Sequence, residues 1–552
     1  MMFRAALSAR AASRAVRASH AIRPASLAIR PASSAPSFDA AAFTDRFLRE
    51  VEDVPAATDP AQSAAALRRL VRSGVLKFTD MADDPDKFFL AHRLLSTVGL
   101  GGFGIRFTVQ FNLFAGSIVG LAGPDQRAML DEFQRAGDLG CFLLTERQAG
   151  VLSGLIVETT ATWNDDAQAF ELHTPRPAAA KNWISQGFVA TRGVVVADLV
   201  VGGRSHGPHA FVMRLRDDAT GALLPGIAVE DMGIKTVAND LDNARVTFDR
   251  VPLPRSALLN KFADISPEGA YVQVDPNEKM RIEVIGQRLL TGRMVIAQAA
   301  LLCARTLHMR TEAYAATKTC NGLAGEVPLG EMPQLKAVLS DGYARLDAML
   351  GFAAAVERRL SATLKAGAIP DDDLVDAISV CKIRCIDAAI EATHALRKEV
   401  GSFALMHGSG FELADMLLCC KFAEGDSRIL QQKLARDRLR ALQRRGLVGA
   451  AADALLPGPD AAEARAALRL ARALAPAGRD RDKLAAAMDA NWREVYELAE
   501  LVADRHIRDA AQGVEFPEGP VVERFRAAAT GFDADWKAKL GAADERAVAA
   551  AA

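Results

Sequence analysis

The sequence predicts a multidomain α+β protein, because blocks with helical spacing flank a central block with strand spacing. Apolar residues recur at every third or fourth position before residue 140 and again after about residue 278. Between these blocks, short apolar or alternating runs are separated by Gly, Asn, Asp and Pro, as in strands joined by turns. No GxGxxG motif stands between a strand and a helix, so a doubly wound dinucleotide-binding sheet is not expected.

Residues 1–38 differ in composition from the rest of the chain. They are rich in Ala, Ser and Arg and contain no acidic residue before Asp39. This composition predicts a transit peptide and a mitochondrial location. A disordered basic tail is the alternative for the segment, and a peroxisomal location is the alternative for the protein.

Residues 39–140 are expected to form an N-terminal helical domain. Its most apolar run, 98–122, is interrupted by Arg106, Gln110 and Asn112. Charged and amide side chains are costly in a bilayer, so this run predicts a buried helical hairpin and no membrane span.

Residues 141–260 are expected to form a central antiparallel β-barrel or sandwich. Helical spacing then predicts a C-terminal helical bundle over 275–445, and a Pro/Gly break at 456–460 leads to an additional helical region within 446–552. The strands of the central domain are expected in the runs 188–190, 194–201, 210–215, 227–230 and 244–248.

Charge and cysteine content exclude several classes of partner. The chain has 67 Lys and Arg against 68 Asp and Glu, so nothing in its net charge of −1 predicts nucleic acid or an anionic membrane as a partner. The seven cysteines form no CxxC pair and no His stands at zinc-ligand spacing, so we expect reduced thiols and no metal site.

Several segments between about residues 109 and 437 resemble the acyl-CoA dehydrogenase and oxidase superfamily, most closely acyl-CoA oxidases. The resemblance implies the acyl-CoA dehydrogenase-like fold, with a helical domain, a β-barrel and a helical bundle in that order. The segments are Val109–Ile118, Gly140–Glu146, Glu158–Thr162, Leu172–Pro175, Leu224–Ile227, Leu241–Asn243, Val251–Pro254 and Cys419–Leu430.

The resemblance implies a FAD-dependent enzyme that converts acyl-CoA to trans-2-enoyl-CoA in fatty-acid β-oxidation, with O2 as the electron acceptor. It places Thr145, Trp183 and Ser185 beside the flavin ring, which needs hydrogen-bond donors and an aromatic wall. A Trp that fills the core of the barrel is the alternative for Trp183.

Glu424 is the predicted catalytic base, because desaturation of a thioester requires one positioned group to remove the weakly acidic α-proton. Burial against apolar surface raises the pKa of such a carboxylate and makes it a better base. Gly425 lets the backbone pass close to the substrate. A solvated Glu on a helix surface is the alternative, and Glu283 is the carboxylate nearest to the earlier helix that carries the base in some relatives.

The family also binds FAD with residues of a neighbouring subunit, so the resemblance implies a homodimer or homotetramer. Gly401 and Ser402 resemble part of the glycine-rich turn near the FAD pyrophosphate, where backbone amides meet phosphate oxygens. Arg310 and Gln334 occupy positions at which the family supplies side chains to the ADP half.

Two departures from the family pattern leave alternatives open. The loop from Thr145 to Ser153, near the substrate entrance, lacks the usual glycine-rich sequence. This loop, in which Ser153 is expected to contact substrate, also suggests a catalytically silent acyl-CoA-binding protein. Ser185 stands where oxidases tend to have Gly, which is typical of dehydrogenases that pass electrons to an electron-transfer flavoprotein.

Overall fold

Helices, strands and further helices follow one another in the order that the sequence predicts, which confirms the fold class. The computed structural model describes residues 38–54, 59–98, 101–150, 156–274, 288–323, 325–406, 408–455 and 457–510. Contacts divide the chain into residues 1–39 and a second unit, Ala40–Ala552. All elements described below lie in the second unit, and the domain boundaries within it stay predictions.

The N-terminal helices pack around a cluster of phenylalanine rings. Phe107 contacts Phe47 and Phe111, at centroid distances of 5.9 and 4.7 Å. The helices are α2 (Ala40–Glu50), α3 (Pro60–Ser73), α4 (Asp80–Asp83), α5 (Pro85–Val98), α6 (Gly102–Thr108), the π-helix η3 (Val109–Phe114), α7 (Ala115–Leu121) and α8 (Pro124–Ala136).

The apolar run at 98–122 is not a helical hairpin, so that prediction is wrong. α6, η3 and α7 follow without a break from Gly102 to Leu121. The polar residues that interrupt the run lie within this continuous helix and are buried and hydrogen-bonded. Gln110, for example, accepts a hydrogen bond from the backbone N–H of Gly140 at 2.8 Å.

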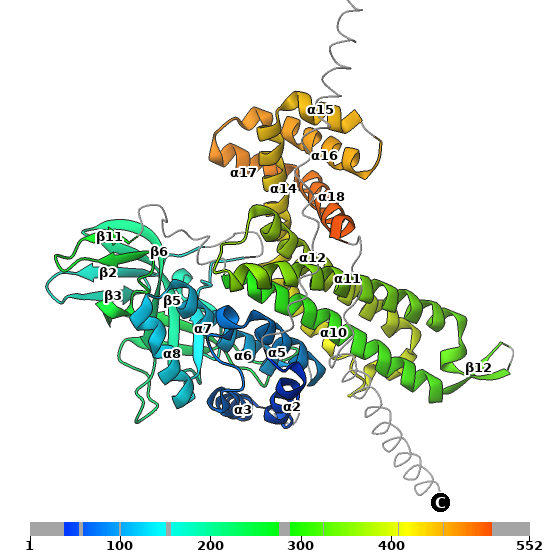
Figure 1. The fold of residues 1–552 in the computed structure, drawn as a ribbon, viewed down its shortest axis with the longest axis horizontal. Helices are drawn as coiled ribbons and strands as arrows, with labels where there is room; N and C mark the ends of the chain where they lie inside the picture. Colours follow the sequence, from blue (N-terminus) through cyan, green and yellow to red (C-terminus); the bar gives the residue numbers. More distant parts are fainter. Residues whose placement is uncertain are drawn as a thin grey trace, which may run out of the picture. The chain divides into compact units, whose positions relative to one another are not determined.

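The central domain is a half-barrel and not a closed antiparallel barrel (Figure 1). Its larger sheet has the strand order β1-β5-β2-β3-β9, with β6 paired to β5, and both β1 and β2 run parallel to β5. These strands are β1 (Gly140–Leu143), β2 (Thr160–Asn164), β3 (Ala169–His173), β5 (Arg192–Val201), β6 (Arg204–Arg214) and β9 (Val251–Pro254).

A second sheet, of order β4-β8-β7, packs on the first. Val195 and Phe211 of the larger sheet join Ile184 and Val246 of the smaller one in a single buried cluster. The smaller sheet consists of β4 (Lys181–Ser185), β7 (Ile227–Asp231) and β8 (Asn243–Phe248), and a separate hairpin is formed by β10 (Ala263–Ile265) and β11 (Tyr271–Gln273).

A buried arginine connects the helices to the sheets. The Arg106 guanidinium is fully buried and donates hydrogen bonds to Gln186 at 3.2 Å and Asp242 at 3.0 Å. Asp242 in turn accepts from the Phe188 backbone N–H at 2.8 Å. These bonds hold residues 188–190 in a turn, so the strand predicted there is wrong.

Three long helices lie side by side and form the predicted bundle (Figure 1). They are α10 (Arg288–Thr317), α11 (Pro333–Lys365) and α12 (Asp372–Glu399), and the hairpin of β12 (Thr319–Gly322) and β13 (Gly325–Pro328) joins the first two. A 3-10 helix, η7 (Gly401–Leu405), then leads to α13 (Leu413–Phe422) and α14 (Ser427–Arg445).

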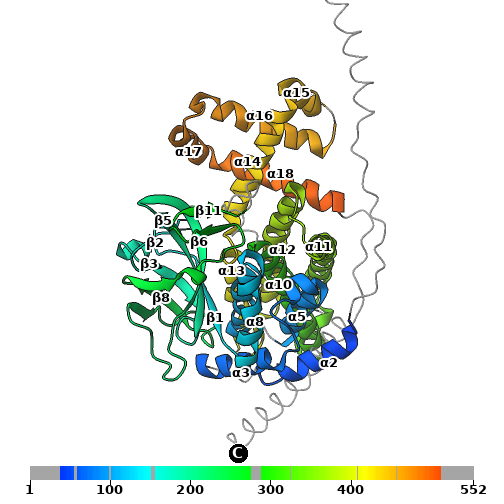
Figure 2. The same cartoon turned by 60° about the vertical axis from the view of Figure 1, so that its left-hand side comes forward.

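Further helices follow the bundle, as the sequence predicts (Figure 2). Arg384 of α12 forms an ion pair with Glu500 of α18 (Trp492–Ala510), which attaches this region to the bundle. The helices are α15 (Leu447–Leu455), α16 (Pro459–Leu474), α17 (Arg481–Ala490) and α18 (Trp492–Ala510).

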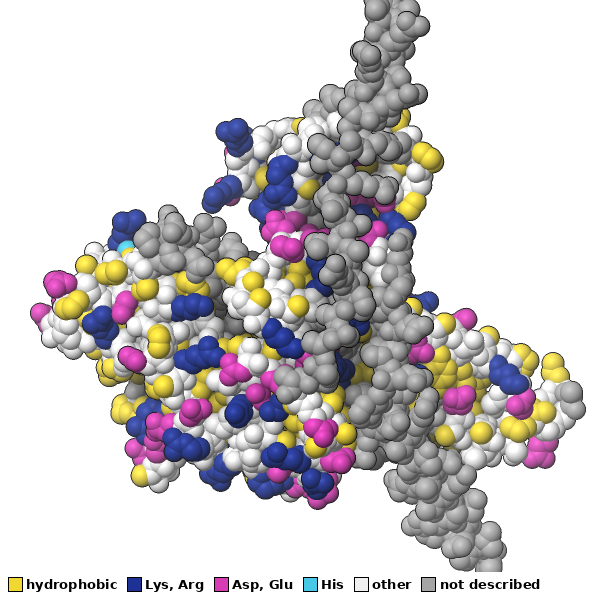
Figure 3. Space-filling model, viewed as in Figure 1, with side chains coloured by type: hydrophobic (Ala, Val, Ile, Leu, Met, Phe, Trp, Pro, Cys, Tyr) yellow, Lys and Arg dark blue, Asp and Glu magenta, His cyan; other side chains and the backbone are white. Residues whose placement is uncertain are grey.

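Basic and acidic side chains are intermixed over the described part of the face seen in Figure 3. This agrees with the near-zero net charge. None of the described helices has the length and apolar character needed to cross a membrane.

Arg106→Met is expected to lower the free energy of unfolding by about 3–5 kcal/mol, because Asp242 would be left buried without its partner. Urea unfolding followed by circular dichroism measures the change. Arg69→Met is the matched control: Arg69 forms an exposed ion pair with Asp53, so its loss is expected to cost within about 0.5 kcal/mol. Equal losses in the two variants would contradict the role of Arg106.

Candidate active site

Glu424 lies in the short turn between α13 and α14. Its φ is 56° and that of Gly425 is 96°, so two consecutive residues are left-handed. This conformation costs a non-glycine residue roughly 1–2 kcal/mol, and such strain concentrates at functional sites. The sequence led us to expect Gly425, but not the left-handed Glu424.

The Glu424 carboxylate lies against α10 at a position where that helix has no side chain. A Cβ atom on Gly292 would be 2.3 Å from Glu424 Cδ and 2.5 Å from each carboxylate oxygen. The predicted importance of Glu424 therefore depends on Gly292, which the sequence analysis missed because a glycine within a helix carries no chemical signal.

Glu424 is half-buried, and one oxygen of its carboxylate is removed from water. Oε2 is buried and has no hydrogen-bond partner within the described part of the chain. Burial raises the pKa of Glu424 to about 8, although the charges of Arg293 and Lys382 act in the opposite direction. The solvated helix-surface alternative therefore does not describe this residue.

Two cations bind the backbone of the turn. Arg293 Nε on α10 donates to the Glu424 carbonyl oxygen at 2.9 Å, and Lys382 Nζ on α12 donates to that of Gly425 at 2.8 Å. Neither residue was identified from the sequence, because each acts on backbone atoms more than 40 positions away along the chain.

Thr145 lies just after β1, and Trp183 and Ser185 lie on β4, which a backbone hydrogen bond joins to Thr145. Thr145 follows β1, is exposed, and accepts the backbone N–H of Asn182 at 2.8 Å. Trp183 is 58% exposed and left-handed, with φ 59°, so it is not a core aromatic. Ser185 accepts a hydrogen bond from the Asn243 side chain at 3.3 Å.

A buried ion pair supports these strand residues. Glu146 and Lys181 are fully buried and lie 2.9 Å apart. Glu146 also accepts the backbone N–H groups of Glu158 and Thr159, at 2.8 and 2.9 Å. The pair lies next in sequence to Thr145 and close to Trp183, so it holds the two strand ends together.

Glu424 and the strand residues are linked through the π-helix η3. Thr291, beside Gly292, donates to the Asn112 side chain at 2.5 Å, and Gln110, two residues earlier in η3, bonds the first residue of β1. No hydrogen bond joins Glu424 directly to Thr145, Trp183 or Ser185 among the described residues.

Arg310, Gln334, Gly401 and Ser402 belong to a second group around one apolar cluster. Leu307, Leu335 and Phe403, which lie near them in sequence, pack together in that cluster. The Arg310 guanidinium lies near Gly410 of the turn after η7, whereas Gln334, Gly401 and Ser402 are exposed.

Gly292 and Arg310 lie about 27 Å apart along α10 at 1.5 Å per residue, so the second group is remote from Glu424 within one chain. Ser153 and Glu283 lie outside the described residues. No cluster of His, Cys, Asp and Glu suited to a metal ion is found in the ranges that the structure covers.

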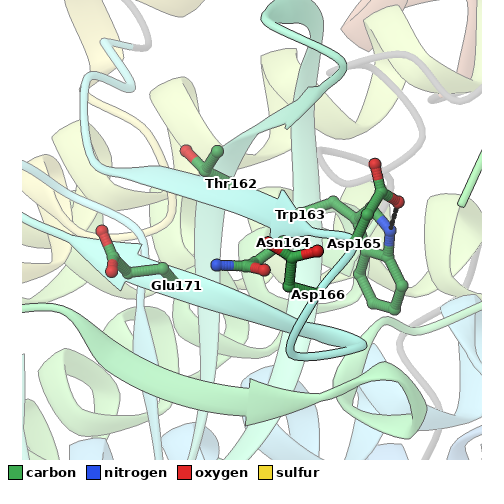
Figure 4. A pocket seen from close by; sticks show the side chains of 6 residues that line it. All are labelled: Thr162, Trp163, Asn164, Asp165, Asp166 and Glu171. Carbon is green, nitrogen blue, oxygen red and sulfur yellow. Dashed lines mark hydrogen bonds between the residues drawn. The ribbon is translucent and has the colours of Figure 1, made fainter.

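A polar surface hollow of about 470 Å³ lies on the β2–β3 hairpin (Figure 4). It is lined by Thr162, Trp163, Asn164, Asp165, Asp166 and Glu171. The Trp163 indole donates to Asp165 at 2.8 Å. None of the predicted site residues lines this hollow.

The chain is similar in sequence to acyl-CoA oxidases. It is 34% identical over 242 residues to acyl-coenzyme A oxidase 2, peroxisomal, of Arabidopsis thaliana, which covers 42% of this chain and 34% of that protein. It is 30% identical over 272 residues to the human peroxisomal acyl-coenzyme A oxidase 3, covering 48% and 38%. These matches span only about a third of the relatives' length, and no family model matches.

Acyl-CoA oxidases also share the fold. Acyl-CoA oxidase 1 of Yarrowia lipolytica has a TM-score of 0.69 at 17% identity, covering 91% of this chain and 84% of that one. Acyl-CoA oxidase-1 of Caenorhabditis elegans, complexed with FAD and ATP, has a TM-score of 0.69 at 20% identity, covering 90% and 79%. Sequence and structure thus confirm the resemblance to the acyl-CoA oxidase and dehydrogenase superfamily.

The relatives contradict the predicted mitochondrial location, because those from Arabidopsis thaliana and Homo sapiens are named peroxisomal. The prediction rested on the arginine-rich composition of residues 1–38. Composition of this kind is not specific to a transit peptide, since a disordered basic tail shares it. Residues 1–37 lie outside the described part of the chain.

Glu424 is expected to make the stability of the fold depend on pH. Its pKa of about 8 exceeds the ordinary 4.5, so between these values the folded state holds a proton that the unfolded chain has released. Stability therefore falls as pH rises through this range, by at most roughly 1.4 kcal/mol per pH unit.

Glu424→Gln has no such proton and is expected to lose less stability than the wild type between about pH 5 and about pH 7. Urea unfolding at several pH values measures both slopes. Equal slopes in the two proteins would contradict a raised pKa for Glu424.

Proposed function

We propose that this chain is a FAD-dependent acyl-CoA oxidase, which converts acyl-CoA to trans-2-enoyl-CoA in fatty-acid β-oxidation. The observation that carries the proposal is the buried Oε2 of Glu424, which lies on a strained turn and has no hydrogen-bond partner among the described residues. A carboxylate in this state needs a ligand or a proton to compensate for lost hydration. The sequence relatives and structural neighbours described above are named acyl-CoA oxidases, which supports the same activity.

The residues present fit a flavin. Trp183 offers a largely exposed aromatic ring, and Thr145 offers an exposed hydroxyl beside it. The acyl-CoA oxidase-2 of Caenorhabditis elegans is described as bound with FAD, ascaroside-CoA and ATP, which supports a flavin and a CoA thioester as ligands here. A bound flavin would supply the acceptor for the hydride that leaves the β-carbon.

Glu424 takes the α-proton of the thioester in this proposal. A base works best when its pKa lies near the pH of the reaction, and a value of about 8 meets this condition better than that of a solvated carboxylate. Gly425 leaves room for the thioester, and the backbone N–H of Glu424 donates to its carbonyl oxygen, which stabilises the developing enolate charge. Ser153, predicted at the substrate entrance, stays a proposal.

The second group of residues serves a neighbouring subunit. Arg310, Gln334, Gly401 and Ser402 would bind the ADP half of a flavin held mainly by the other chain, because they lie far along α10 from Glu424. The active protein would then be a homodimer or homotetramer.

An electron-transfer flavoprotein is the second candidate acceptor. Ser185 favours it, because oxidases tend to have Gly at this position, which opens a route for O2 to the reduced flavin. The similarity to acyl-CoA oxidases favours O2.

Glu424→Gln is expected to retain the yellow flavin and to slow its bleaching by acyl-CoA by about 10²–10⁴-fold, because the proton acceptor is lost. Stopped-flow absorbance under anaerobic conditions measures the rate. Glu391→Gln, which alters an exposed helical Glu paired with Arg345, is the matched control and should bleach at the wild-type rate. Bleaching of Glu424→Gln at the control rate would remove Glu424 from the role, and a colourless wild-type protein unable to take up flavin would favour the silent alternative.

The reduced protein is expected to be reoxidised by air faster than by an electron-transfer flavoprotein, and Ser185→Gly is expected to increase the rate with air. Double-mixing stopped flow after anaerobic reduction compares the two acceptors. Faster reoxidation by the flavoprotein would favour the dehydrogenase alternative.

A further inference from the structure

Lys382 is buried on α12, and its hydrogen bonds go to the turn that carries Glu424. Its Nζ donates to the carbonyl oxygens of Lys421 at 2.6 Å and Gly425 at 2.8 Å, and to the Ser427 hydroxyl at 3.1 Å. We propose that Lys382 is a positioning residue whose ammonium group holds this turn so that Glu424 lies against Gly292. The inference rests on the proposed function and concerns the residue that supports its base.

The number of donors matches the number of acceptors. A lysine ammonium has three N–H donors and no acceptor, and it meets three oxygen atoms here. The Ser427 hydroxyl donates a hydrogen bond to the Lys421 carbonyl oxygen at 3.2 Å, so its own oxygen can accept one from Lys382. In the charged form, Lys382 supplies one N–H donor to each of the three oxygens.

The three oxygens lie on both sides of the strained residues. Lys421 is in the last turn of α13, Gly425 is in the turn itself, and Ser427 begins α14. A cation at the carbonyl end of a helix is favourable, because the helix dipole places negative charge there. Lys382 therefore joins the two helix ends across the left-handed pair and offsets the cost of that conformation.

Neither of the two nearby carboxylates, Asp387 and Asp426, forms an ion pair with Lys382 in the described structure. Asp387 pairs with Lys421, and Asp426 accepts the backbone N–H of Arg428 at 2.8 Å. Other groups that interact electrostatically with Lys382 include Arg293, Cys419, Cys420 and Glu424. Burial lowers the pKa of Lys382 to about 7, and its charge in turn lowers the pKa of Glu424.

The test compares three variants of the full-length, flavin-loaded protein. Lys382→Met removes the charge and all donors at similar length, whereas Lys382→Arg keeps a charge and several donors. Lys433→Met is the matched control, because Lys433 bonds Asp376 and Asp437 at 2.7 Å each and does not contact the turn.

The first measurement needs no turnover. The infrared carboxyl band of Glu424, identified by its absence in Glu424→Gln, is titrated against pH. Lys382→Met is expected to raise the midpoint by about one pH unit, because a nearby positive charge is lost. Lys382→Arg and the control should keep the wild-type midpoint, and an unchanged midpoint in Lys382→Met would overturn the proposal.

The second measurement is flavin bleaching by saturating acyl-CoA. Lys382→Met is expected to bind flavin normally and to bleach about 10²-fold more slowly, since a displacement of about 1 Å at the base suffices for such a loss. Partial recovery in Lys382→Arg and a wild-type rate in the control support the proposal. A wild-type rate in Lys382→Met overturns it.

The experiment also distinguishes failure of the proposed function, and misfolding of Lys382→Met, from failure of the role given to Lys382. If the wild-type protein does not bleach, the proposed function fails, while the infrared titration still decides the role of Lys382. If Lys382→Met does not fold, Ser427→Ala takes its place, because it deletes one of the three acceptors. A few-fold slower bleaching in Ser427→Ala supports the proposal, and an unchanged rate overturns it.

Discussion

The site depends on keeping one carboxylate oxygen out of water in a place where no residue that the structure describes forms a hydrogen bond with it. Glu424 Oε2 meets this condition only because Gly292 leaves space on α10 and because the turn is left-handed at two consecutive residues. Burial of the carboxylate oxygen costs free energy through lost hydration, and the left-handed turn costs free energy through backbone strain. Arg293 and Lys382 compensate by binding the carbonyl oxygens of the turn from two different helices. Burial raises the pKa of Glu424, and the charges of Arg293 and Lys382 act against this rise.

Buried hydrogen bonds connect the helix beside the turn that carries Glu424 to strand β1, which precedes Thr145, and to β4, which carries Trp183. Asn112 bonds the residue next to Gly292, while Gln110 bonds the start of β1, and both belong to the π-helix η3. Glu146 and Lys181 then hold the ends of β1 and β4 together. Buried polar groups of this kind are stable only when their partners are correctly placed, so they favour one arrangement of the helices and sheets.

Much of this architecture was predictable from local patterns. The spacing of apolar residues changes from helical to strand-like and back along the chain. This spacing shows which face of each element is buried, so it can be recognised from nearby residues alone. Pairing of strands is not encoded in this way. The half-barrel with β1 and β2 parallel to β5, and the turn held by Asp242, depend on contacts between distant residues, and the sequence analysis missed both.

The same division applies to the site. Sequence alone predicted Glu424 and Gly425 from one motif, Thr145 from a second, and Trp183 and Ser185 from a third, because each motif is a short contiguous segment. Only the tertiary structure decided that Gly292, Arg293, Lys382 and the Glu146–Lys181 pair support them. Their roles arise from burial and from bonds to atoms far away along the chain. A glycine or a lysine within a helical pattern gives no sign of such contacts until the helices are packed.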